Sequence, residues 1–364
     1  MKNNLSELSK IRAFTIKHNL KVLLKWKPNK FSGFLNEKHN EIEDRYITSE
    51  YKLSNDFYGI ASSLKKYANY HKPLKLFLEH GVYFGEHVNQ EEIGNVMPGI
   101  MTYSDNRKEQ IKKKSNIPVI CIGPYINYVK PFYNLEEIEK FKKKYGKILL
   151  VFPQHTIEGI SIDESTELLI NKINEIKKCE NFDNVFISLY YREVNEKYLN
   201  LYINSGFIPI CSGNRQDPDF LARLKSFILM SSSTASNNVG THIGYCYALN
   251  REHILIDTNT KIIADKKENM KNVPELYLDS AIKEKEEVKQ AFYSKDDKKI
   301  KKVVEKYWGT NYNYTEEELK SIFVTFDRVY KIAKKNNKEY SEVLNEILMN
   351  EKETKEIFER KNIR

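Results

Sequence analysis

Short apolar runs alternate with amphipathic stretches through the middle of the chain. Runs that end in glycine, proline or polar clusters, as buried strands do, cover residues 147–156, 184–191, 207–213, 227–233 and 253–258. Segments with apolar residues at helical spacing lie between them, at 163–180, 195–206, 217–227 and 234–250. Strands that alternate with helices form βαβ units, so the pattern predicts a parallel sheet of the Rossmann type.

The pattern is weaker on either side of this region. Before it we expect a helix at 55–70, buried strands at 74–82 and 117–126, and a helix at 134–146 that Asn134 caps at its start and Gly146 at its end. From about residue 260 the chain is helical and highly charged. The expected fold is α/β, with two Rossmann-like domains facing a cleft. We place their boundaries at 1–143 and 144–260, and expect a helical segment, 261–364, that packs on both.

The composition fits a folded protein that stays in the cytoplasm. Of 364 residues, 40% are hydrophobic and 12% aromatic, which is enough to fill packed cores. No apolar stretch is long enough to span a membrane, and the N-terminus lacks the apolar run of a signal peptide. The cysteines Cys121, Cys179, Cys211 and Cys246 are far apart, which favours free thiols over disulfides or a zinc site.

The net charge of +9 is open to three interpretations. Lysines spread over many predicted helices favour ordinary solvated surfaces. The same charge could attract a phosphorylated substrate or the anionic inner face of the plasma membrane, as a peripheral contact. Nucleic acid ranks last as a partner, because no zinc-finger, KH or RNP motif is present.

A serine-rich turn offers the strongest candidate for an anion site. Residues 231–242 read SSSTASNNVGTH, and we expect them to pass from a strand into a helix. The N-terminus of a helix has unpaired N–H groups and the positive end of the dipole, so it binds phosphate. Hydroxyl donors at the turn would add to it: Ser231, Ser232, Ser233 and Thr234. The plainer alternative is that one of them only caps the helix.

A histidine turn follows the predicted strand 147–156. After Pro153 come Gln154, His155 and Thr156. Ligands of parallel sheets bind at the carboxyl ends of the strands, and a histidine there can protonate a phosphate or hold it by a charged hydrogen bond. Gly213, at the end of the predicted strand 207–213, is a further candidate at the same edge.

The segment LEHGVYFGEH (78–87) supplies candidates for a general base. Glu79, His80, Glu86 and His87 flank two glycines after a predicted strand, and at least two of the four are expected to be ordinary loop residues. The pair Asp217 and Asp219 could hold a metal, but we interpret Asp217 as a helix N-cap and expect no metal. His242 is expected to be a packed helix residue.

The order of these motifs resembles that of bacterial GT-B-type surface-polysaccharide glycosyltransferases. A His-Gly loop, a later histidine turn and a Ser-rich turn before a helix resemble the sialyl-, polysialyl- and Kdo-type transferases, which use CMP-sugars, and more distantly the CDP-glycerol polymerases. The resemblance covers roughly residues 75 to 258. In this chain the proline comes two residues before His155, and Thr156 follows it.

The resemblance implies a reaction and roles for the candidate residues. A sugar would move from a nucleotide donor, with CMP-sugars favoured, to a glycan or lipid-linked acceptor, with inversion and without metal. His155 and two of the three serines would contact the donor phosphate, and Glu79 or His80 would be the base of the first domain. Transfer of glycerol or ribitol phosphate from a CDP-alcohol is the alternative within enzymes. A nucleotide- or glycan-binding protein without turnover is the alternative outside them.

Overall fold

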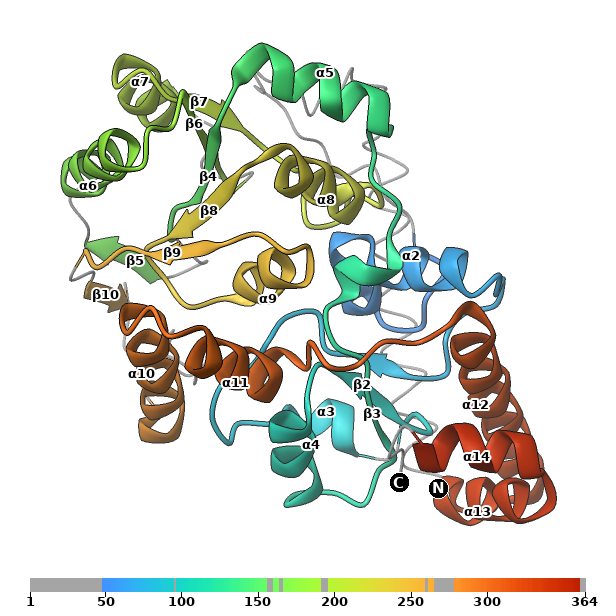
Figure 1. Ribbon diagram of the computed structural model, residues 1–364. Coiled ribbons are helices and arrows are strands. Elements are labelled where there is room, and N and C mark those ends of the chain that lie inside the picture. The colour runs from blue at the N-terminus through green and yellow to red at the C-terminus, as the bar shows by residue number, and fades with distance from the viewer. Residues whose placement is uncertain are drawn as a thin grey trace.

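The structure, a computed structural model, describes residues 48–94, 96–155, 160–163, 166–190, 196–258, 261–264 and 278–360. Its architecture is mixed α/β, with two parallel sheets and one antiparallel pair of strands, β5 and β10 (Figure 1). The strands are β1 Phe77–Leu78, β2 Ile100–Thr102, β3 Val119–Cys121, β4 Ile148–Phe152, β5 Ile160–Asp163, β6 Asn184–Ser188, β7 Ile208–Ile210, β8 Ser233–Ser236, β9 His253–Leu255 and β10 Lys261–Ala264. The helices are η1 Leu53–Gly59, α2 Ile60–Tyr67, α3 Gln90–Ile93, α4 Asp105–Lys112, η2 Tyr125–Tyr128, α5 Leu135–Tyr145, α6 Thr166–Cys179, α7 Glu196–Asn204, α8 Phe220–Met230, α9 Thr241–Ala248, α10 Asp279–Tyr293, α11 Asp297–Trp308, α12 Glu316–Asn336, α13 Tyr340–Asn350 and α14 Lys352–Arg360.

The larger sheet confirms the predicted parallel arrangement. Its strand order is β7-β6-β4-β8-β9, and every neighbouring pair is parallel. The chain starts at β4, moves outward through β6 and β7, then returns to the other side of β4 for β8 and β9. The order therefore reverses between β4 and β8, and parallel sheets bind ligands outside such a reversal point.

Helices cover both faces of this sheet. Leu149 and Val151 of β4 pack with α6 and α7, while Leu150 and Phe152 belong to a core that includes α5 and α8. This alternation follows from the two-residue period of a strand. Helix α5 begins and ends as predicted, with Asn134 in a capping box and Gly146 at the C-cap.

The smaller sheet precedes the larger one in the chain. Strands β1, β2 and β3 are parallel, in that order. Strands β1 and β3 lie within the predicted runs 74–82 and 117–126 but are shorter, and β2 was not predicted. One core of buried side chains, which runs from Phe77 of β1 to Leu150 of β4 and Phe326 of α12, contains members of both sheets. The division into domains at residues 143 and 260 stays a prediction.

The C-terminal helices touch both halves of the chain. Helix α11 contacts α4 beside the small sheet and α9 beside the large one (Figure 1). Its last residue, Trp308, is fully buried against Gly244 of α9, where a Cβ atom would lie 2.2 Å from the indole. The Trp308 indole N–H donates to the carbonyl of Gly240 at 3.2 Å. Trp308 thereby fixes the start of α9.

The predicted strand at 227–233 and the predicted start of the next helix at 234 were wrong. The apolar run 227–230 continues α8 instead of forming a strand. Leu221, Leu224 and Ile228 lie on the buried face of that helix, and the apolar run extends this face. The strand is Ser233–Ser236, and α9 begins only at Thr241. A short apolar run fits a helix or a strand equally well, so periodicity alone could not decide between them.

Small polar residues form the buried strand β8 because their hydroxyls find partners in β9. Thr234 Oγ1 lies 2.9 Å from Nδ1 of His253, and Ser236 Oγ lies 2.9 Å from Nε2 of the same ring. A buried polar group is tolerated when it is hydrogen-bonded. The strand thus forms without the apolar residues that signal a strand in the sequence.

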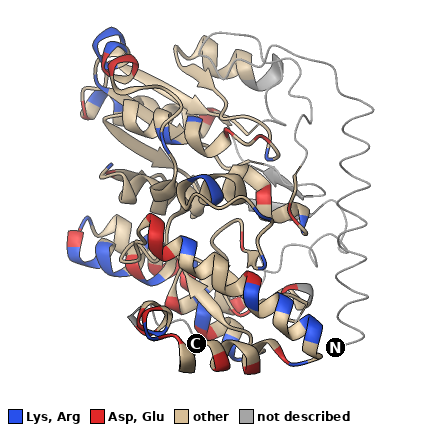
Figure 2. Ribbon diagram, turned by 90° about the vertical axis from the view of Figure 1, so that its right-hand side faces the viewer, with Lys and Arg blue, Asp and Glu red and all other residues tan. Residues whose placement is uncertain are grey.

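The surface shows mixed charge. Figure 2 shows Lys and Arg interspersed with Asp and Glu along the outer helices of the described chain. Within that part of the chain, no helix is both long and apolar enough to cross a membrane. All four cysteines are free thiols, as expected; Cys179 is exposed and the other three are buried. Contact with an anionic membrane stays a prediction.

Candidate functional site

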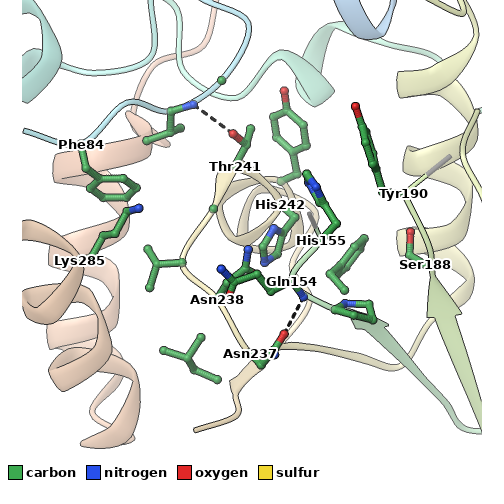
Figure 3. Close-up of a pocket in the computed structure, with 18 of the residues that line it drawn as sticks. Phe84, Gln154, His155, Ser188, Tyr190, Asn237, Asn238, Thr241, His242 and Lys285 are labelled. Atoms are coloured by element: carbon green, nitrogen blue, oxygen red, sulfur yellow. Dashed lines mark hydrogen bonds between the residues drawn. The ribbon is translucent and has the colours of Figure 1, made fainter. Parts of the chain in front are cut away.

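A pocket of about 1030 Å³ lies at the carboxyl ends of the large sheet and reaches the loop after β1. Segments that follow β4, β6, β8 and β9 line it, together with that loop and one face of α10 (Figure 3). The polar and aromatic members are Tyr58, His80, Tyr83, Phe84, Phe152, Gln154, His155, Ser188, Tyr190, Ser212, Phe220, Asn237, Asn238, Thr241, His242, Tyr245, Asp257, Thr258, Lys285, Glu286, Lys289 and Tyr293. The pocket therefore sits where the strand order of the large sheet reverses.

The turns after β4 and β8 are joined across the reversal point. The backbone N–H of Gln154 donates to Asn237 Oδ1 at 2.7 Å, and Asn237 Nδ2 donates to Thr258 Oγ1 at 3.2 Å. Both Asn237 and Thr258 are buried. This chain of hydrogen bonds holds the ends of three neighbouring strands in a fixed arrangement around the pocket.

His155 lies in the pocket, as the sequence predicted. Its ring stacks on Tyr190 after β6, with ring centroids 4.3 Å apart and planes 17° from parallel. Figure 3 shows both rings at the wall formed by the strand ends of the large sheet. Gln154 also lines the pocket, whereas Thr156 lies outside the described residues. The stacked pair gives this wall a flat aromatic surface and a ring nitrogen that can carry a proton.

The N-terminus of α9 opens on the pocket. Gly240 is its N-cap in an extended conformation, and Thr241 begins the helix. Thr241 Oγ1 accepts a hydrogen bond of 3.0 Å from the Val82 N–H, so the loop after β1 is tied to α9. The first N–H groups of a helix lack partners within the helix, which makes this end suited to anions.

His80 reaches the pocket from the small sheet. Aromatic rings of Phe57, Tyr58 and Tyr83 surround its imidazole at centroid distances of 5.3 to 6.3 Å. Burial, helped by the positive charges of Lys52 and Arg215, lowers the pKa of His80 to about 4. The imidazole is therefore neutral near pH 7 and can accept a proton.

Glu79 does not line the pocket. Its side chain is 1% exposed, bonded to the guanidinium of Arg107 at 2.6 Å and to the Thr102 hydroxyl at 2.6 Å. These bonds occupy a carboxylate that sequence reasoning offered as a base. Glu86 and His87 are exposed and also lie outside the pocket lining. Of the four candidates in 78–87, only His80 is brought to the site.

The serine-rich turn lies at the other end of β8. Ser231 Oγ donates to the carbonyl of Ile228 at 2.8 Å, and Ser232 Oγ accepts from the Ile148 N–H at 3.2 Å. Ser233 begins β8, and Thr234 is within it. These residues line no part of the pocket. The prediction that they precede a helix was wrong because the helix begins one strand later.

Gly213 and Asp217 belong to a structural loop. Gly213, whose φ of +117° favours glycine, lies beside the pocket residue Ser212 but does not line the pocket. Asp217 was predicted as a helix N-cap, but α8 begins at Phe220 and Asp219 occupies the cap position. Asp217 instead binds Arg223 at 3.0 Å. Within the described residues no cluster of His, Cys, Asp and Glu could hold a metal.

Several residues that sequence reasoning missed have buried polar atoms at this pocket. Ser212 Oγ, Asn238 Oδ1 and His242 Nε2 have no hydrogen-bond partner among the described residues. His242 stacks on Phe152 with centroids 5.0 Å apart, and burial, with the nearby His155, lowers its pKa to about 3. Unsatisfied polar atoms that gather in one pocket are typical of a binding site. The NNVGTH run after β8 contained this signal, once the strand was placed correctly.

Solved structures of the wall teichoic acid polymerase TagF match this chain at low similarity. One superposes with a TM-score of 0.41 and 13% identity, and covers 70% of this chain and 68% of that one. A histidine-to-alanine variant of TagF gives a TM-score of 0.40 and 12% identity, over 71% and 68% of the two chains. No family model and no curated protein matches the chain.

Proposed function

We propose that this protein transfers a sugar from a nucleotide-activated donor to a hydroxyl group of a glycan or lipid-linked acceptor. The observation that carries the proposal is that one pocket contains both the reversal point of the large sheet, with His155, and the neutral His80 of the other sheet. A nucleotide site on one wall and a proton acceptor on the other are the parts that such a transfer needs.

The donor would lie on the large sheet. Its phosphate would meet the N-terminus of α9 near Gly240 and Thr241, and the polar atoms of Asn238 and Ser212 would bind donor groups. His155 would donate to the leaving phosphate. The stacked ring of Tyr190 offers a surface on which a base or a sugar can pack.

The reaction would be a direct displacement. His80 takes the proton of the acceptor hydroxyl, and the acceptor oxygen forms a bond to the anomeric carbon. The bond from that carbon to the phosphate oxygen breaks, and its electron pair leaves with the nucleotide. The helix N-terminus and His155 stabilise the charge that builds on this oxygen. Displacement from the opposite face inverts the anomeric carbon, and no metal is required.

Ligand binding tests the first part of the proposal. A thermal-shift panel would compare CMP, CDP, UDP and GDP with their sugar conjugates. A ligand at a hundred times its Kd stabilises the folded protein by about 2.7 kcal/mol, which gives a measurable rise in Tm. We favour the cytidine nucleotides, in keeping with the resemblance of the motifs. If no nucleotide or conjugate shifts the Tm, the proposal is wrong.

Product analysis separates the remaining alternatives. With the donor found in the panel and a glycan acceptor, mass spectrometry would distinguish a transferred sugar from a transferred polyol phosphate. Activity that survives EDTA is expected for a metal-independent transferase. A protein that binds nucleotides without turnover would give no product and would keep its biological activity when His80 and His155 are both replaced by alanine.

A further inference from the structure

Helix α10 forms a wall of the pocket that lies outside both sheets. The residues that line the pocket recur at helical spacing on one face of α10. They are Ile282, Lys285, Glu286, Lys289 and Tyr293. Its other face is buried through Ala281, Val288, Ala291 and Phe292. The amphipathic helix therefore presents a defined set of side chains to the pocket.

The helix is fixed to the loop that carries His80. Glu284 accepts hydrogen bonds from the Gly85 N–H at 2.6 Å and from Asn106 Nδ2 at 3.1 Å. Gly85 has a φ of +77°, and a Cβ atom there would lie 2.8 Å from the backbone nitrogen of Ala281. The helix also contacts β9 of the large sheet. Its position relative to the pocket is thus set from both sides.

Among the described residues that line the pocket, Lys285 and Lys289 are the lysines, and none is an arginine. Both are partly buried, whereas the lining carboxylates Glu286 and Asp257 are exposed. Figure 3 shows Lys285 and Phe84 on the side of the pocket opposite Ser188 and Tyr190, with Gln154 and Asn238 between them. Lys285 therefore lies across the pocket from the aromatic wall, and both lysines are less exposed than the two acids.

The phosphates of a nucleoside diphosphate are negatively charged, so their binding site needs positive charge. The pKa values of His80 and His242 are lowered, so neither ring carries a charge at pH 7. A helix N-terminus supplies only about half an elementary charge. A nucleotide donor bound without a metal therefore needs further positive charge from side chains to offset its phosphates. Lysine ammonium groups bind phosphate as point charges.

We infer that Lys285 and Lys289 of α10 clamp the phosphate groups of a nucleoside diphosphate against the N-terminus of α9. The inference rests on the proposed function and adds to it the kind of donor: one with two phosphates, held by the C-terminal helical segment. It also gives that segment a part in the site, since the sheets by themselves supply neither lysine.

The experiment measures binding by calorimetry to the full chain and to the variants Lys285→Gln, Lys289→Gln and the double variant. The probes are CDP, cytidine and inorganic pyrophosphate. Lys283→Gln is the matched control, because Lys283 lies on the same helix but is exposed and outside the pocket. The Tm of each variant shows that it is folded.

We expect the double variant to bind CDP and pyrophosphate roughly 10- to 100-fold more weakly, the value of one or two charged hydrogen bonds. Cytidine binding and the Lys283→Gln variant should be unchanged. If the double variant binds CDP as tightly as the original chain, or loses cytidine equally, the clamp is wrong while the proposed function stands. If the original chain binds pyrophosphate through these lysines but no nucleoside or nucleotide more tightly, the lysines hold two phosphates as inferred, but the nucleotide donor, and with it the proposed function, is wrong.

Discussion

The guanidinium of Arg107 holds the carboxylate of Glu79 through three hydrogen bonds of 2.6 to 3.0 Å. Its remaining nitrogen donates to the carbonyl of His87 at 2.6 Å, and its central carbon lies over the ring of Tyr83, 5.2 Å from the ring centroid. Arg107 thus binds the start, the middle and the end of the loop that carries His80. The Tyr83 hydroxyl in turn lies 3.4 Å from Nε2 of His80.

The Arg107→Met variant should be strongly destabilised. Both partners of the ion pair are buried, with side chains 5% and 1% exposed, so the variant leaves a buried carboxylate without its cation. Losing one partner of a buried pair costs about 3–5 kcal/mol of unfolding free energy. Urea unfolding measures it. Lys306→Met, which breaks a half-exposed pair with Glu287, is the control and should change the midpoint little. Similar small losses in both variants would contradict the structural role.

The pH dependence of transfer should report His80. Burial lowers its pKa to about 4, and a general base acts in its neutral form. The rate kcat/KM should therefore stay level as the pH falls from 8 to about 5, and decline only as it approaches 4. His80→Gln should lower turnover by about 10²–10⁴-fold and leave nucleotide affinity near normal. A decline centred near pH 6.5, the ordinary range of histidine, would rule His80 out as the base.

Replacing His155 should affect the donor side of the reaction. His155→Ala removes a proton donor to the leaving phosphate, so turnover should fall by about 10²–10⁴-fold. Slow hydrolysis of the donor without acceptor should fall as well, which is not expected of a defect on the acceptor side. The exposed His71, which lies outside the pocket, gives the control variant His71→Ala. Equal transfer rates for both variants and the original chain would show that His155 takes no part in the reaction.

The serine-rich turn should be dispensable for nucleotide binding. Ser232 and Ser233 lie at the amino end of β8, away from the pocket, so Ser232→Ala/Ser233→Ala should leave nucleotide affinity unchanged. Asn238→Ala removes a pocket oxygen that has no partner among the described residues and should weaken nucleotide binding by about 1 kcal/mol. Calorimetry compares the two. A larger loss of nucleotide affinity in the double serine variant than in Asn238→Ala would indicate that the serines bind the phosphate.

Stability should fall in acid because of the buried histidines. The pKa of His242 is about 3 in the folded chain, so between pH 6.5 and 3 the unfolded chain holds a proton that the folded chain does not. The stabilising effect is complete above pH 6.5 and declines as the pH falls, by about 1.4 kcal/mol per pH unit for one proton. Urea unfolding at pH 7, 6 and 5 should show a shallower decline for His242→Asn. Parallel declines would mean that His242 is charged in the folded state.

Local signals in the sequence determined much of the secondary structure. Asn134 at the start and Gly146 at the end defined α5 to within a residue, because the groups that cap a helix lie on that helix or next to it. The alternation of apolar runs and amphipathic segments predicted the parallel sheet. It also placed Gln154 and His155 at a strand end, where ligands bind. His80 was found for the same reason.

The tertiary structure decided what depends on distant partners. The sequence could not show that β8 is built from Ser233–Ser236, because the hydroxyls of that strand are satisfied by His253 of another strand. It offered Glu79 and His80 equally, and only the position of Arg107 removed Glu79 from the choice. Lys285 reaches the pocket because α10 packs on a loop nearly two hundred residues earlier in the chain. Strand ends and helix caps follow from short-range order, whereas a site assembled by packing depends on contacts that no local pattern encodes.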